Sequence, residues 1–223
     1  MAFSETLLDG ARTIREEISR HPFVLGLGDG SLPTEKFRFY LAQDYLFLIE
    51  YCRVFGLAVA KARDLGLMTR LAGLLHSTLE VEMELHRSYS AEFGISRETL
   101  EQTEASPVTR AYTSHLLTVA WSGELGEILA ALLPCQWGYW ELGLQLAERH
   151  RAARDNPYRQ WIATYSSREF GELARWLQGV VDGLAEEAPS EDLARMEQGF
   201  RVSSRYELMF WDMAWRLETW PVS

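Results

Sequence analysis

The chain has 223 residues, of which 47% are hydrophobic and 24% charged, and these values predict one globular domain over residues 1–223. Its formal net charge of -10, with no local cluster of lysine and arginine, argues against nucleic acid or an anionic membrane as a partner, because both would repel it. Two cysteines, no run of about 18 apolar residues and an N-terminus unlike a targeting peptide exclude a disulfide framework and a membrane span, so we expect a cytoplasmic protein.

Helical periodicity dominates the chain. Apolar and aromatic residues recur at steps of three and four over residues 4–19, 35–64, 67–92, 107–121, 124–148, 157–183 and 190–219. Glycine, proline, serine and asparagine separate these segments, and none of them shows the alternating pattern of a β-strand. The sequence therefore predicts an all-α bundle of about seven helices.

The helix predicted over residues 35–64 carries a carboxylate on its apolar face. Asp44 lies on one stripe with Phe47 and Tyr51, and a buried carboxylate is costly unless it is paired or hydrogen-bonded. Two interpretations remain open. Asp44 is a core aspartate satisfied by a tyrosine or by Arg53, or it binds a ligand or transfers protons.

Within the helix predicted over residues 124–148, Pro134 precedes a cysteine. A proline inside a helix costs about 3 kcal/mol and opens the backbone, so we expect a kink here. Cys135 and Tyr139 are four residues apart and share one face, which the kink would present to a pocket. The alternative is that Cys135 is a small buried hydrophobic residue, because a reactive thiol needs a lowered pKa or a neighbouring base.

The last predicted helix places a second carboxylate among rings. Glu207 shares its face with Phe210 and Trp211, and apolar surroundings raise the pKa of a carboxyl group. Glu207 would then be a usable proton donor near neutrality. An ion pair with Arg201 or Arg205 is the competing interpretation.

Two tyrosines and the histidines complete the candidates. Tyr112 in AYTSHLL and Tyr165 in WIATYSSREF each fit either a core or a pocket. His86 follows Glu82 by four residues, and no Glu-x-x-His pair of the kind that helical bundles use for two iron ions occurs. The chain also lacks the glycine motifs that bind nucleotides. We therefore expect no metal and no cofactor.

Six segments, in order, resemble the TenA family, also called thiaminase II, of the haem-oxygenase-like superfamily. They are HPFVLGLGDGSLPTEKFRFYLAQDYLFLIEY, LEVEMELHRSY, AYTSHLL, LAALLPCQWGYWELG, YRQWIATYSS and SSRYELMFWDMAW. The cysteine in LLPC resembles the cysteine-bearing branch of the family. The resemblance implies an all-helical fold, commonly a homotetramer, and hydrolysis of 4-amino-5-aminomethyl-2-methylpyrimidine to the hydroxymethyl pyrimidine and ammonia. It also implies slower cleavage of thiamine into pyrimidine and thiazole.

The resemblance further implies roles for single residues. Cys135 is similar to the nucleophile, Glu207 to the proton donor, and Asp44 to the carboxylate that grips the pyrimidine nitrogens. Tyr139 and Tyr165 are similar to the family residues that hydrogen-bond to the substrate, and Tyr112 is similar to a ring that packs against it.

One position departs from the family pattern. Phe47 stands where many members carry a tyrosine whose hydroxyl assists the cysteine, so the ring is kept and the hydrogen bond is lost. Two alternative functions remain open, and only the first of them depends on Phe47. One is a non-catalytic pyrimidine-binding or regulatory protein, and the other is a different chemistry on the same fold, such as an oxidation or a metal-dependent reaction.

Overall fold

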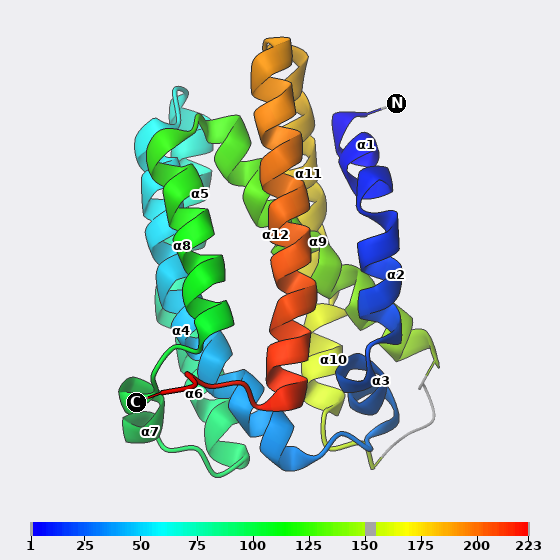
Figure 1. The fold of residues 1–223 in the computed structure, drawn as a ribbon. Helices are drawn as coiled ribbons and strands as arrows, with labels where there is room; N and C mark the ends of the chain where they lie inside the picture. The colour runs from blue at the N-terminus through cyan, green and yellow to red at the C-terminus, as the bar shows by residue number, and fades with distance from the viewer. Residues whose placement is uncertain (1, 150–154, 223) are drawn as a thin grey trace. The chain divides into compact units, whose positions relative to one another are not determined.

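The computed structural model describes residues 2–149 and 155–222, and these residues form helices without any β-strand (Figure 1). The predicted all-α class is therefore confirmed. None of the helices in the described ranges combines the length and the apolar character that a membrane crossing requires. The helices are α1 (Phe3–Gly10), α2 (Arg12–Arg20), α3 (Pro22–Asp29), α4 (Thr34–Lys61), α5 (Leu65–Ser77), a π-helical turn (Thr78–Glu82), α6 (Met83–Glu92), α7 (Arg97–Gln102), α8 (Pro107–Ser122), α9 (Leu125–Arg149), α10 (Arg159–Tyr165), α11 (Arg168–Glu186) and α12 (Ser190–Arg216).

The predicted number of about seven helices is too low, because an apolar face continues past points where the helix itself stops. Residues 4–19 form α1 and α2, which meet at Ala11. Residues 157–183 form α10 and α11, and Ser167 begins the second of these because its Oγ accepts a hydrogen bond from Phe170 N at 3.1 Å.

Helix α3 is absent from the sequence prediction for a different reason. Its eight residues are apolar on nearly every side, with Phe23, Val24 and Leu27 all fully buried, so no amphipathic pattern reveals the helix. Its start is nevertheless well defined. His21 Nδ1 accepts from Phe23 N at 3.2 Å, and Pro22 occupies the first helical position, where a missing N–H costs nothing.

The chain divides into two compact units. Unit 1 comprises Met1–Pro33 and Leu129–Asp212, and unit 2 comprises Thr34–Ile128 and Met213–Ser223. The chain passes from one unit to the other within α9 and again within α12. The expectation of a single domain over residues 1–223 stays a prediction.

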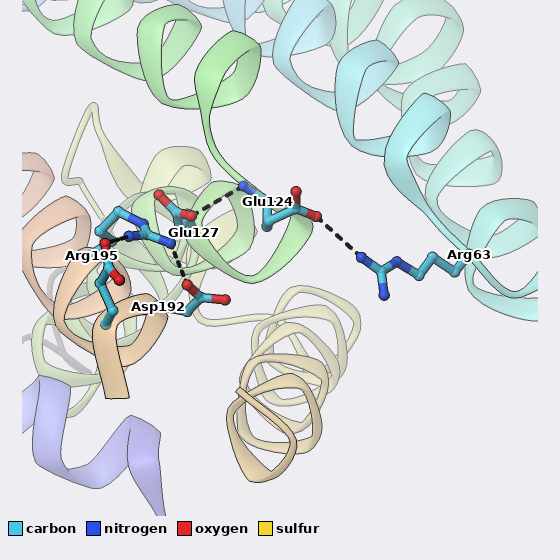
Figure 2. A network of polar contacts seen from close by, with 6 residues as sticks. Arg63, Glu124, Glu127, Asp192 and Arg195 are labelled. Atoms are coloured by element: carbon cyan, nitrogen blue, oxygen red, sulfur yellow. Dashed lines mark hydrogen bonds and ion pairs between the residues drawn. The ribbon is translucent and has the colours of Figure 1, made fainter. Parts of the chain in front are cut away.

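In unit 1, buried polar side chains fix the ends of the short helices. Ser4 is fully buried, and its N and Oγ donate to Asp182 at 2.7 and 2.8 Å, which joins α1 to α11. Asn156 Nδ2 donates to the carbonyls of Leu27 and Gly28 at 2.8 and 2.9 Å. These are terminal carbonyls of α3, which would otherwise lack a partner. On the surface of unit 1, Figure 2 shows Arg195 paired with Asp192 at the start of α12.

In unit 2, the long helix α4 packs against α5, the π-helical turn, α6, α7 and α8. The apolar stripe expected within residues 35–64 is buried except at Leu48, which is half-buried; its members are Phe37, Tyr40, Leu41, Asp44, Phe47, Leu48, Tyr51 and Phe55. Figure 2 shows how α9 begins. Glu127 Oε1 accepts from Glu124 N at 3.1 Å, and the Glu124 carboxylate lies 3.5 Å from Arg63.

Candidate functional site

The structure places the predicted site residues in two groups, one in each unit. The group in unit 1 contains Cys135, Tyr139, Tyr165 and Glu207, and the group in unit 2 contains Asp44, Phe47 and Tyr112. Within each unit, the geometry around these side chains is well defined.

Tyr139 and Tyr165 belong to a cluster of rings in unit 1. The Tyr139 ring centroid lies 4.9 Å from that of Tyr165, 5.4 Å from Trp211 and 5.9 Å from Trp161. Trp161 and Tyr165 are themselves 4.5 Å apart. Tilted pairs at these distances are favourable and bury large areas. The cluster therefore joins α9, α10 and α12 and restricts where the two tyrosines point.

A glycine allows α9 to approach the end of α10. A Cβ atom at Gly143 would lie 2.5 Å from the carbonyl carbon of Tyr165 and 2.6 Å from Ser166 N, distances at which atoms overlap. Both clashes are with backbone, which cannot rotate away as a side chain can. The position of Tyr165 against Tyr139 therefore depends on the absence of a side chain at Gly143.

Glu207 lines a cleft in unit 1. Its side chain is 5% exposed, and the cleft holds about 500 Å³ of empty space, part of which is open solvent. Its walls come from α1, α2, α9 and α12 and are mostly apolar; they include Leu8, Ile18, Pro134, Tyr139, Leu142, Phe200 and Trp211. The predicted placement of Glu207 among rings is thus observed.

A charged pair completes the lining of this cleft. Arg15 Nε donates to Glu141 Oε2 at 3.0 Å, and Arg15 Nη1 donates to the carbonyl of Leu8 at 3.1 Å. Both charged side chains are about 30% exposed, at 29% and 30%. No local pattern in the sequence indicates this pair, because the two residues are 126 positions apart.

Cys135 is half-buried, and α9 continues on both sides of Pro134. Pro134 and Tyr139 line the cleft, whereas Cys135 between them does not. The other cysteine is more deeply placed. Burial raises the pKa of the Cys52 thiol to about 11; the charge of Glu82 adds to this rise and Arg53 opposes it. Because the thiolate is the reactive form, Cys52 is unsuited to act as a nucleophile near neutral pH.

In unit 2, Asp44 is 7% exposed and faces a histidine. Asp44 Oδ2 lies 3.2 Å from His86 Nε2. Arg53, the partner that the sequence suggested, instead pairs with Glu50 on the surface, so that suggestion is wrong. From the sequence, His86 was a candidate only as a metal ligand. The only indication in the sequence that Asp44 would contact a residue such as His86 was that a buried carboxylate needs a polar partner.

Phe47 and Tyr112 contact each other in unit 2, with ring centroids 5.0 Å apart. A buried amide holds their helices together. Gln43 Oε1 accepts from Ser106 N at 2.9 Å and from Thr109 Oγ1 at 2.7 Å, at the start of α8. Phe47 follows Gln43 by about one turn of α4, and Tyr112 follows Thr109 by about one turn of α8. The amide therefore sets the approach of the two rings.

Within the described part of the chain, no three His, Cys, Asp or Glu side chains gather closely enough to hold a metal ion. The candidate residues described above comprise a thiol, two buried carboxyl groups and a set of tyrosine and tryptophan rings.

The sequence model of the TENA/THI-4/PQQC family matches residues 8–217. The chain belongs to this family. The aminopyrimidine aminohydrolase of Halalkalibacterium halodurans is 46% identical to it over 221 residues, which cover 99% of this chain and 98% of that protein.

Solved structures agree with membership in the TENA/THI-4/PQQC family. The TenA homologue from P. horikoshii OT3 is 34% identical, with a TM-score of 0.88 over 97% of this chain and 99% of that chain. A domain of unknown function with a heme oxygenase-like fold from Shewanella denitrificans OS217 is 14% identical, with a TM-score of 0.74 over 97% and 93%, and it shows the fold alone. The predicted family and the predicted haem-oxygenase-like fold are confirmed.

We predict that Gly143→Ala destabilises this TENA/THI-4/PQQC family member by about 1 to 3 kcal/mol, because the added methyl group must displace α10. Urea denaturation would measure the free energy of unfolding. Gly179→Ala in α11 is the matched control: apart from its chain neighbours and the nearby backbone of its own helix, nothing lies within 4 Å of its Cβ position, so alanine should be neutral or stabilise by up to about 1 kcal/mol. Equal stability of Gly143→Ala and the unchanged protein would contradict the close approach.

The raised pKa of Cys52 predicts a pH dependence for alkylation. In the Cys135→Ser variant, iodoacetamide should modify Cys52 slowly at pH 7 to 8 and faster as the pH rises toward about 11, since only the thiolate reacts. Intact-mass measurement over time gives the rate, and the urea-unfolded variant supplies the rate of an accessible thiol. Rapid modification of folded Cys52 at pH 8 would contradict its burial.

Proposed function

We propose that this chain is an aminopyrimidine aminohydrolase of thiamine salvage. Its substrate is 4-amino-5-aminomethyl-2-methylpyrimidine, and its products are the hydroxymethyl pyrimidine and ammonia. The observation that carries the proposal is full-length similarity, at 46% identity, to a protein named for this activity. The buried Glu207 in an apolar cleft and the thiol of Cys135 on α9 are consistent with it.

In the proposed reaction, the Cys135 thiolate adds to a carbon of the pyrimidine ring. The electron pair moves toward the ring carbon that bears the aminomethyl group, and the bond between methylene and amine breaks as Glu207 gives its proton to the leaving nitrogen. Water then adds at the methylene, the thiol departs, and Glu207 recovers a proton. The balance is one water consumed and one ammonia released.

The other residues bind the ring in this proposal. Asp44 accepts one hydrogen bond from the amino group of the pyrimidine and one from the adjacent ring nitrogen in its protonated form, and the proton on that nitrogen makes the ring a better electrophile. Tyr139 and Tyr165 hydrogen-bond to the substrate, and Phe47 and Tyr112 supply the flat apolar contact that an aromatic ring prefers. The ring contacts within each unit hold the side chains that perform these roles.

Thiamine contains the same pyrimidine, joined through its methylene to a thiazolium that would depart in place of ammonia. The formylamino derivative of the aminopyrimidine is a third candidate substrate. Release of ammonia, formate and thiazole across the three compounds would rank them. The expected homotetramer and the cytoplasmic location stay predictions.

Replacing Cys135 by serine should lower ammonia release by about a thousandfold or more, since a hydroxyl is a far weaker nucleophile than a thiolate at neutral pH. Glu207→Gln should lower kcat by about a hundredfold to ten-thousandfold with KM nearly unchanged. A coupled ammonia assay measures both variants, and Cys52→Ser is the matched control, expected to keep turnover. Ammonia release by Cys135→Ser at the unchanged rate would disprove the covalent mechanism.

Phe47 favours a second candidate function, a pyrimidine-binding protein without turnover, because the hydroxyl that assists the cysteine in the family is missing here. Under the proposed function, Phe47→Tyr should raise kcat by up to about tenfold, the value of one hydrogen bond in the transition state. KM should stay similar, because the ring contact to Tyr112 is kept. Tight binding of the hydroxymethyl pyrimidine with no turnover, in both forms, would favour the binding protein.

A further inference from the structure

The buried carboxylate of Asp44 has an unusual partner for a group of its charge. Among the described residues, no lysine or arginine pairs with Asp44, and its close polar neighbour is His86 on α6. The two side chains are 10% and 9% exposed, so water screens their interaction little. His86 Nε2 is 3.2 Å from Asp44 Oδ2, although its N–H is not aligned as a hydrogen bond requires, so the contact is electrostatic.

The second ring nitrogen of His86 is also held. Ser90 is fully buried one turn further along α6, and its Oγ lies 3.4 Å from His86 Nδ1. A carboxylate oxygen carries only lone pairs, so the contact is attractive when Nε2 bears a hydrogen, and Nδ1 can then accept from the serine hydroxyl. The ring of Tyr45 packs at 5.9 Å from the imidazole. The imidazole is thus clamped between Ser90 and Asp44.

Arg87, the positively charged residue next to His86 in sequence, contacts groups other than Asp44. Arg87 pairs with Glu84 at 3.2 Å and lies 3.5 Å from the Tyr45 hydroxyl. Glu82 adds negative charge on the same side: its pKa is raised mainly by burial and further by the charge of Asp44, while a hydrogen bond with Thr78 opposes the rise. Among the described residues, His86 is therefore the close polar group that can orient the Asp44 carboxylate.

We propose that His86 is a positioning residue for Asp44. It holds Oδ2 and so fixes the plane of the carboxylate, which leaves Oδ1 to meet the amino and ring-nitrogen edge of the pyrimidine. The carboxylate can hydrogen-bond to the edge of a flat pyrimidine only when it lies close to the plane of that ring. A carboxylate free to rotate would adopt this orientation less often and would bind the pyrimidine more weakly. This inference rests on the proposed function, in which Asp44 binds the pyrimidine.

The test compares two replacements of His86 in the full-length protein. His86→Leu keeps the volume and removes the donor, whereas His86→Gln places an amide N–H near the position of Nε2. We expect His86→Leu to raise the Kd for the hydroxymethyl pyrimidine, and the KM for the aminomethyl substrate, by about tenfold or more. His86→Gln should stay within about threefold of the unchanged protein.

Further variants separate positioning from general damage. His76→Leu replaces an exposed histidine on α5 and should change neither Kd nor KM. Ser90→Ala should also raise Kd, by a smaller factor than His86→Leu does. If His86→Leu does not fold, the Kd of Ser90→Ala tests the inference in its place. In an Asp44→Asn background, His86→Leu should have no further effect on Kd, because the two residues act as one unit.

Equal Kd values for His86→Leu and the unchanged protein, with thermal unfolding showing both folded, would overturn the inference. Equal weakening by leucine and glutamine would overturn it as well, since it would mean that volume and not the donor matters. An unchanged protein that neither binds the pyrimidine nor releases ammonia would refute the proposed function and the inference with it. That outcome is distinguishable because it appears before any variant is made.

Discussion

Buried polar groups must find partners, and this requirement shapes the candidate residues of unit 2. On the inner face of α4, Asp44 meets His86, and Gln43 meets the backbone and side chains at the start of α8. Both contacts connect α4 to a helix distant in sequence. Because an unsatisfied buried group costs about 1 to 3 kcal/mol, the hydrogen bonds of Gln43 contribute to stability as well as to the geometry of the site. The contact of Asp44 with His86 is electrostatic and contributes mainly to that geometry. The rings of Phe47 and Tyr112 meet as a result.

Unit 1 achieves a similar precision through rings and small residues. Tyr139 touches Tyr165, Trp161 and Trp211, and Gly143 allows the backbones of α9 and α10 to meet. Large flat side chains have few rotatable bonds, so a cluster of them fixes direction at a low cost in entropy. A carboxyl group beside such a cluster, as at Glu207, is kept from bulk water on most sides.

Periodicity and motif order predicted the helical class, the stripe on α4 and the family, because each depends on neighbours within one segment. The stripe failed only at Leu48, which is half-exposed. Contacts between segments could not be predicted in the same way. The sequence suggested Arg53, nine residues further along the same helix, as a partner for Asp44, whereas the observed partner His86 comes from α6. Helix α3 was missed because its residues are apolar on the exposed side, at Leu25, as well as on the buried side, so no polar face marks it.

The π-helical turn at Thr78–Glu82 sets the phase of the helix that follows it. Each residue of an α-helix advances the side-chain direction by about 100°, and a π-helical turn holds one more residue than an α-helical turn. Removing one residue from this turn would let α5 and α6 merge into a regular helix. Every side chain of α6 would then rotate by about 100° about the helix axis, and the imidazole of His86 would turn away from α4. A local irregularity of the backbone thus determines the angular register of the histidine.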